Sequence, residues 1–227
     1  MLSSLYLAAA IIGITLCMGH QAGVGGIFLL APFKIQPLWY SPWIPAFFVI
    51  SSFFAGLCFV LLEGSLSQRL FANRVSSAHA ASHDDISFGL ARLSVGIMLC
   101  YLALKLAELV MTGEYKLLVA DSYGYWYAVE LLGFVLAPAL VLLKGLHARD
   151  LAVVKYGAGL ALIGIALNRF NLSLIAYNYE ITAGRYVPTF MEVIVTLTVL
   201  SLEFWVYRLI INRLPVVGEG PDWLPGH

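Results

Sequence analysis

Six mostly apolar stretches fill most of this 227-residue chain, and short segments with proline, glycine or charged residues separate them. An α-helix needs about 20 such residues to cross the hydrocarbon core of a bilayer. The six stretches lie near residues 5–24, 42–62, 90–111, 125–143, 151–177 and 188–214. We therefore predict an all-α fold, a polytopic bundle of about six transmembrane helices over residues 1–217, with a short cytoplasmic tail at 218–227.

The composition explains why these stretches cannot form the core of a soluble domain. Hydrophobic residues make up 61% of the chain and charged residues 11%, whereas soluble domains contain about 45–50% and about 25%. A soluble fold of this length could not bury so much apolar surface, so membrane lipid must surround it. The formal net charge of zero and the lack of a basic run give no electrostatic case for binding nucleic acid.

The borders of the stretches predict how the helices begin, bend and connect. No basic segment precedes the first stretch and further spans follow it at once, so we expect a retained helix rather than a cleaved signal peptide. Pro138, inside the fourth stretch, predicts a kink that neighbouring helices absorb. Gly145 and Asp150 predict a tight connection between the fourth and fifth helices.

Lysine and arginine residues predict the orientation of the helices. One set of span ends collects eight of them: Arg69, Arg74, Arg92, Lys144, Arg149, Lys155, Arg208 and Arg213. The opposite set collects Lys34, Lys116 and Arg185. Because basic residues accumulate on the cytoplasmic side of membrane proteins, we expect the first set and both termini to be cytoplasmic.

Polar side chains inside the spans are the most informative feature of the sequence. An ionisable group at the bilayer centre costs at least about 2.5 kcal/mol, so such groups normally face protein or water. Most of them fall in the outer half of the predicted spans: His20, Lys105, Glu108, Glu130, Asn168, Arg169, Asn171 and Glu192. Glu203 lies near mid-membrane, and Glu63 lies near the cytoplasmic face, where it either exchanges protons or marks the interface. The asymmetry predicts a polar, hydrated cavity that faces outward.

Two interpretations of these charges stay open. Lys105 and Glu108 are three residues apart on one helix face and can form a structural ion pair. Glu130, Arg169 and Glu192 come from three different helices. They either fix the packing of the bundle or line a pathway for protons or quinone.

His20, which ends the first apolar run together with Gln21, also has two interpretations. It is either a hydrogen-bonded packing residue or a proton partner for a small ligand with a carbonyl or phenol group. Haem is not expected, because haem needs axial ligands on facing helices. The other histidines fall in predicted loops or at the chain end: His79, His83, His147 and His227.

Iron–sulfur clusters and other metal sites are not expected in this chain either. Its three cysteines all lie inside apolar runs without C-x-x-C spacing: Cys17, Cys58 and Cys100. Such thiols normally behave as small buried apolar residues.

The segment "GHQAGVGGIFLLAPFKIQPLWYSPWIPAFFVIS" (residues 19–51) closely resembles a segment of the NrfD/PsrC-type membrane subunits, especially the HybB-like subunits of periplasmic [NiFe]-hydrogenases. "ALNRFNLSLIAY" (166–177) and "RYVPTFMEVIVTLTVLSLEFWVYRLIINRLPVV" (185–217) resemble later helices of that family, and "VLLEGSLSQRLF" and "VELLGFVLAPALVLL" also fit. The likeness covers nearly the whole chain and corresponds to the C-terminal part of the family's usual length.

This resemblance implies a haem-free, quinone-reactive subunit of a respiratory oxidoreductase complex in the cytoplasmic (inner) membrane of a bacterium or archaeon. The subunit would exchange electrons and protons between menaquinone or ubiquinone and an extracytoplasmic iron–sulfur, ferredoxin-like partner, next to a catalytic redox subunit. His20 matches the family's histidine in this helix, a candidate quinone ligand, with Gln21 as its neighbour. The recurring polar positions imply a proton pathway: Glu63, Lys105, Glu108, Glu130, Arg169 and Glu192.

The chain is shorter than typical family members, which have further helices before this segment. Either another membrane polypeptide supplies that part, which we expect, or this chain is a shortened or differently assembled relative. Two alternatives compete with the quinone hypothesis: an ion- or proton-translocating subunit without quinone chemistry, and a structural membrane anchor for a peripheral enzyme.

Overall fold

The computed structural model describes residues 2–70, 77–177, 179 and 188–213. It divides into two compact units, one formed by Met1–Leu62 with Ser87–Arg185 and the other by Glu63–Ile86 with Tyr186–His227. Some predicted features lie outside the described residues: the tail at 218–227, Arg74, Arg185 and His227.

The described secondary structure is helical, apart from one isolated bridge. The α-helices are α1 (Leu2–Leu29), α2 (Ile44–Leu70), α3 (Ser77–Met111), α4 (Ser122–Leu131), α5 (Ala137–Ala148), α6 (Leu151–Phe170) and α7 (Phe190–Arg213). Two short 3₁₀ helices follow α1 and α3, namely η1 (Pro32–Lys34) and η2 (Glu114–Val119). Two π-helical turns, η3 (Leu132–Leu136) and η4 (Asn171–Ile175), continue α4 and α6.

Six of the described helices are long and apolar enough to cross a membrane, which confirms the all-α, six-span prediction. The fourth span is continuous from α4 through η3 to α5. Helices α2 and α3 extend well into the polar segment that the sequence suggested was a loop. Bilayer thickness sets a minimum length for a span but no maximum, and the alanine-rich stretch after Ser77 favours helix.

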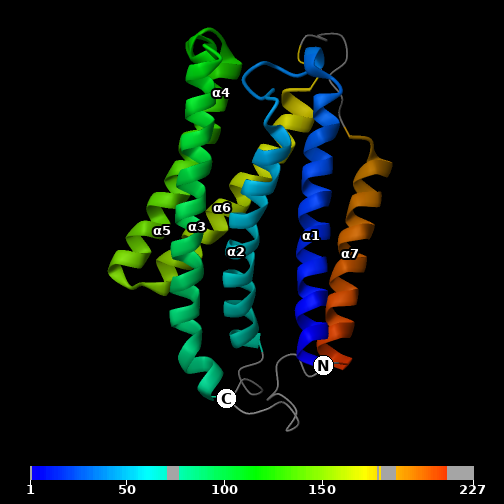
Figure 1. Cartoon of the computed structure of the whole chain (residues 1–227), viewed down its shortest axis with the longest axis vertical. Coiled ribbons are helices and arrows are strands. Elements are labelled where there is room, and N and C mark those ends of the chain that lie inside the picture. The colour runs from blue at the N-terminus through cyan, green and yellow to red at the C-terminus, as the bar shows by residue number, and fades with distance from the viewer. Residues whose placement is uncertain (1, 71–76, 178, 180–187, 214–227) are drawn as a thin grey trace. The chain divides into compact units, whose positions relative to one another are not determined.

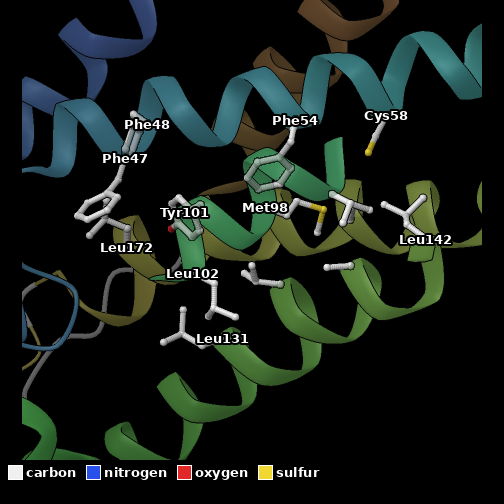
Figure 2. Close-up of a cluster of buried hydrophobic side chains, with 14 of the residues drawn as sticks. Phe47, Phe48, Phe54, Cys58, Met98, Tyr101, Leu102, Leu131, Leu142 and Leu172 are labelled. Carbon is white, nitrogen blue, oxygen red and sulfur yellow. The ribbon is translucent and has the colours of Figure 1, made fainter. Parts of the chain in front are cut away.

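The core of the first unit lies where α2, α3, α5 and α6 meet. Phe54 and Cys58 of α2 and Met98 of α3 are almost completely buried, together with Leu142 of α5. Figure 2 shows these side chains directed toward a common centre. Among the cysteines only Cys58 is buried, whereas Cys17 and Cys100 are exposed on the chain surface, so the prediction of burial was wrong for those two.

Within the first unit, helix α1 packs against α2 through its last turns. A Cβ added to Gly25 would lie 2.9 Å from the Cα of Pro45, so the missing side chain lets α1 approach the start of α2 closely. Phe28, one turn later, meets the ring of Phe48 with centroids 5.9 Å apart. The preceding turns of α1 are mostly exposed, including Leu7 and Ile11.

The connection between α5 and α6 is as tight as predicted. Arg149 adopts the left-handed conformation (φ 49°), and Asp150 caps α6 by accepting a 2.9 Å hydrogen bond from the Ala152 amide. Glycines then let the two helices approach one another: a Cβ on Gly157 would lie 2.9 Å from Cγ of Leu142. Figure 1 shows α5 and α6 as a hairpin, with α6 running obliquely to the more upright α2 and α3.

This packing predicts opposite effects for two neighbouring glycines of α6. Gly157→Ala forces a methyl group against Leu142 and should lower the free energy of unfolding by about 1–3 kcal/mol. Gly159→Ala places its methyl group where no atom lies within 4 Å. It should be neutral or stabilise by up to about 1 kcal/mol through helix propensity. Unfolding of the detergent-solubilised protein measures both, and equal effects would contradict the close contact.

The kink predicted at Pro138 has a local counterpart in η3, the π-helical turn that ends two residues before it. Proline lacks an N–H and clashes with the carbonyl four residues earlier, here Phe134. The π turn redirects the hydrogen bonds, because the Ala137 amide donates to the Leu132 carbonyl. On the α6 side, Gly164 faces the Phe134 carbonyl, where no side chain would fit.

The connection between α1 and α2, residues 30–43, folds over one end of the first unit. Ile35 forms an antiparallel bridge with Tyr177, just beyond η4, and the Gln36 amide donates to the Ala176 carbonyl at 3.0 Å. Ile35 and Trp39 are 2% and 3% exposed. This connection therefore belongs to the packed structure, and it directs Trp39 inward between the helices.

Candidate functional site

Glu130, at the end of α4, is the centre of a buried polar cluster. Its side chain is 3% exposed. Oε2 accepts hydrogen bonds from Trp39 Nε1 at 3.0 Å and from Asn171 Nδ2 at 2.5 Å, and Oε1 accepts from Asn168 Nδ2 at 2.5 Å. A buried carboxyl group without partners would cost several kcal/mol, so these three donors explain why the group is tolerated. We call Trp39, Glu130, Asn168, Arg169 and Asn171 the Glu130 cluster.

Arg169 joins the cluster through an amide rather than through a direct ion pair. Its Nη1 donates to Oδ1 of Asn168 at 2.8 Å, and the same amide donates to Glu130. Its Nη2 donates to Ser51 Oγ at 2.8 Å and to the Phe48 carbonyl at 3.3 Å. The guanidinium carbon also lies 3.6 Å from the centre of the Phe48 ring. Glu130 and Arg169 are therefore connected through Asn168, which lies between the two charges.

Both π-helical turns lie next to this cluster. Glu130 is two residues before η3, and Asn171 is the first residue of η4. π turns are rare and occur frequently at functional sites, because the extra residue changes which side chains share a face. The two turns thus mark this end of the first unit as a specialised region.

Lys105 and Glu108 of α3 form the ion pair that their spacing predicted, with Nζ and Oε2 3.3 Å apart. The Ser41 hydroxyl, from the α1–α2 connection, donates to the other carboxylate oxygen of Glu108. Nζ of Lys105 also lies 4.0 Å from the centre of the Phe47 ring. The ammonium group is thus held between a carboxylate and an aromatic face, both able to stabilise a cation.

The Glu130 cluster and the Lys105–Glu108 pair meet at a small cavity of about 20 Å³. Its polar lining consists of Tyr101, Lys105, Tyr127, Glu130, Asn168 and Arg169. A cavity of this size has room for about one water molecule, and its lining offers the two to four polar partners that such a molecule needs. Three predicted site residues from three helices, Lys105, Glu130 and Arg169, therefore share one polar space.

Asn171 adds an unsatisfied polar atom to this region. The residue is 0% exposed, and its Oδ1 has no hydrogen-bond partner among the described residues. Native structures rarely leave a buried amide oxygen unpaired. The atom therefore marks a position where a water molecule or a polar ligand group would be stabilised.

His20 and Gln21, the predicted quinone ligands, lie on α1 and do not line this cavity. His20 is exposed and Gln21 half-buried. Because Gly25 packs against the start of α2 and α1 runs antiparallel to α2, His20 lies at about the level of Phe48 and Ser51. The structure does not bring His20 into the Glu130 cluster, and its role stays a prediction.

Glu63 and Glu192 belong to the second unit. The Tyr207 hydroxyl donates to Oε1 of Glu63 at 2.6 Å, which links α2 to α7. Glu192 accepts hydrogen bonds from the Thr189 amide and hydroxyl, at 2.7 and 3.0 Å. Both bonds run from Thr189 to the Glu192 carboxylate, which satisfies a free amide at the start of α7 and gives Glu192 a structural role in addition to its predicted one.

Trp39 is a member of the Glu130 cluster that the sequence analysis did not single out. Together with Tyr40 and Trp43 it had the pattern of an aromatic belt at the membrane interface. Trp43 is 66% exposed and fits that pattern, whereas Trp39 is 3% exposed and hydrogen-bonded to Glu130. No local signal separates the two, because only the path of the connection directs one indole inward.

Glu114, in η2 outside the spans, lies close to the ion pair. Burial raises the pKa of its carboxyl group, and the charge of Glu108 acts in the same direction. A hydrogen bond to Thr112 and the charge of Lys105 oppose that rise. The Glu114 carboxyl group therefore takes up a proton at higher pH than an ordinary glutamate. It adds a titratable group on the aqueous side of the Lys105–Glu108 pair.

Comparisons with known proteins agree with the resemblance found in the sequence. The profile of the family described as "Polysulphide reductase, NrfD" matches residues 3–182. A protein of Nitratidesulfovibrio vulgaris (strain Hildenborough), named only "Protein", is 36% identical over 224 residues, which cover 98% of this chain and 58% of that protein. The "Probable Ni/Fe-hydrogenase 2 b-type cytochrome subunit" of Escherichia coli K12 is 28% identical over 202 residues, which cover 87% of this chain and 49% of that protein.

The chain thus spans 58% and 49% of the lengths of these two relatives. No solved structure matches it significantly. The family profile covers α1 to η4 and hence every residue of the Glu130 cluster, together with Lys105 and Glu108. This six-span membrane chain belongs to the NrfD family.

Proposed function

We propose that this chain is an integral membrane subunit of a respiratory oxidoreductase complex. It exchanges electrons and protons between membrane quinone, either menaquinone or ubiquinone, and an extracytoplasmic iron–sulfur partner. Family membership and the name of the Escherichia coli relative support the complex. The single observation that carries the quinone assignment is the cavity shared by Lys105, Glu130 and Arg169.

The chemistry of a quinol explains why such a polar, water-sized cavity would lie beside the ring, where it can pass protons rather than hold the ring itself. Oxidation of one quinol releases two electrons and two protons, so a titratable or hydrogen-bonding group must reach each ring oxygen. The Lys105–Glu108 pair offers a carboxylate that accepts a proton and an ammonium that stabilises negative charge on an oxygen. Arg169 and Asn168 keep the opposite wall of the cavity fixed. The electrons pass to redox centres in the partner.

The placement of the protein follows from the same hypothesis. The ends that carry Lys34 and Lys116 face outward, the end with the α5–α6 connection faces the cytoplasm, and the membrane is the cytoplasmic membrane of a bacterium or archaeon. The proposed partners are a ferredoxin-like iron–sulfur subunit, a catalytic redox subunit and another membrane polypeptide. Glu63 and Glu192 complete the proposed proton pathway, and His20 with Gln21 contacts the quinone from α1.

We propose no haem for this chain, although the name of one relative refers to a b-type cytochrome. Axial haem ligands must face one another across a bundle. His147 lies in the last turn of α5, beside the α5–α6 connection, whereas His20 lies in the half of α1 that ends at the opposite side. These two histidines of the first unit therefore do not form an axial pair.

Quinol oxidation by the purified complex tests the proposed function. Wild-type complex should oxidise a quinol and reduce the iron–sulfur partner, and a quinone-site inhibitor should block both. His20→Ala should reduce turnover while assembly, judged by co-purification of the partners, stays intact. Undiminished turnover would remove His20 from the site. Ion uptake by liposomes that contain the chain alone, without any quinone-linked electron transfer, would favour the ion-translocating alternative.

A further inference from the structure

A large apolar groove lies between α2 and α3, beside the small polar cavity. Its volume is about 560 Å³. Some residues of the segments 42–50 and 104–112 line it, and those of the second segment are Leu104, Ala107, Glu108, Met111 and Thr112. Glu108 and Thr112 are its polar members, and the others include Trp43, Ile50 and Met111. Binding sites for small organic ligands have this size, a mostly apolar lining and a few placed polar groups.

Phe47 and Glu108 connect this groove to the polar site. Phe47 lines both the groove and the polar cavity, so its ring forms the partition between them. Figure 2 shows Phe47 projecting from α2 beside Tyr101, and their rings lie 5.6 Å apart in an edge-to-face arrangement. Glu108 lines the groove, and its carboxylate is paired with Lys105, which lines the cavity. A molecule in the groove thus reaches a charged pair at the same level as the Glu130 cluster.

The position of the groove in a spanning segment restricts what can fill it. Apart from Pro42 and Trp43, its lining belongs to membrane-spanning helices, so a molecule entering from the side must already be dissolved in the bilayer. It must be apolar along its length and carry a hydrogen-bonding head that suits a carboxylate and a hydroxyl. A quinone with an isoprenoid chain has these two parts, whereas a phospholipid would place a phosphate next to the Glu108 carboxylate, which is unfavourable.

We propose that the α2–α3 groove binds the isoprenoid chain of the quinone and admits the molecule sideways from the bilayer, with its ring directed to Glu108 and Lys105. This assignment rests on the proposed function. It adds a site for the isoprenoid chain and a route of entry for the quinone. It also makes Phe47 the residue that separates the groove from the polar cavity.

Filling the groove tests this assignment. Ala107 lies in the wall of the groove, so a tryptophan side chain at this position should occupy much of the groove volume. Ala107→Trp in the assembled complex should raise the KM for a long-chain quinol by at least about tenfold. The KM for an analogue with a short alkyl chain should stay within about twofold, because that analogue does not need the groove. Leu106→Trp is the matched control, since Leu106 is 46% exposed and outside the groove lining.

The possible outcomes distinguish failure of the groove assignment from failure of the proposed function. If wild-type complex oxidises both quinols and Ala107→Trp leaves both KM values unchanged, the isoprenoid chain does not occupy the groove. The proposed function would still hold in that case. An equal loss for both quinols also overturns the assignment, because a chain site must distinguish them. Failure of wild-type complex to oxidise either quinol would refute the proposed function itself. A photoreactive long-chain quinone should label residues 104–112, and equal labelling by a photoreactive phospholipid would identify the occupant as lipid.

Discussion

Replacing Glu130 by alanine should lower quinone-linked turnover of the assembled complex by about 10²–10⁴-fold, the range typical of losing a positioned acid–base group. The change removes the only described acceptor of the Trp39, Asn168 and Asn171 side-chain N–H groups. It also removes the carboxyl group that Asn168 connects to the Arg169 guanidinium, whereas Lys105 keeps its ion pair with Glu108. Turnover with saturating quinol, measured beside assembly, reports the effect.

Two further variants make this test specific. Glu130→Gln keeps the size of the side chain, but its amide nitrogen cannot accept a hydrogen bond, so at least one of the three donors loses its partner. It should therefore also reduce turnover, though less than alanine does. Glu203→Gln changes an exposed glutamate of α7 outside the cluster and is the control. Equal turnover in Glu130→Gln and Glu203→Gln would show that the cluster is structural.

The second large effect concerns stability. Arg169→Ala should lower the free energy of unfolding by about 3–5 kcal/mol, because it removes a buried donor from three acceptors and each lost hydrogen bond to a charged group costs about 1.5–3 kcal/mol. The guanidinium group donates hydrogen bonds to Asn168 Oδ1, Ser51 Oγ and the Phe48 carbonyl at the same time, and an alanine side chain can form none of them. Thermal unfolding of the detergent-solubilised protein measures the loss.

The conservative replacement identifies the cause. Arg169→Lys retains the charge but lacks the planar fork that contacts three groups at once, so it should recover only part of the stability. Arg92→Ala, at an exposed position of α3, should change the unfolding free energy by less than about 0.5 kcal/mol. Full recovery with lysine would mean that charge alone, and not the fork geometry, stabilises this region.

The sequence predicted the number and type of the spans because a bilayer requires a minimum apolar length, and that requirement is visible in any stretch of the chain. The Lys105–Glu108 pair was predictable for a similar reason, because two side chains that are three residues apart on a helix lie on the same face. The cap at Asp150 and the tight α5–α6 connection follow equally local rules. Each of these features depends on neighbours within one turn or one loop.

The Glu130 cluster was predictable only in part. The sequence placed Glu130, Asn168 and Arg169 at a similar depth, but depth alone could not reveal that Asn168 bridges the two charges. The π-helical turns also escaped prediction, since their hydrogen bonds depend on how α6 packs against the Pro138 region. His20 looked central because of its chemistry, yet its exposure depends on which helices face α1, and a periodic pattern does not contain that information.

The hydrogen bond from Trp39 to Glu130 has one more consequence. Trp39 belongs to a connection outside the spans, and its indole is nevertheless one of three donors to a carboxyl group inside them. A protein that docks on this connection and shifts residues 36–39 would change the partners of that carboxyl group directly. Docking of that protein and the hydrogen bonding of Glu130 would then be thermodynamically linked. Each would change the free energy of the other by the same amount.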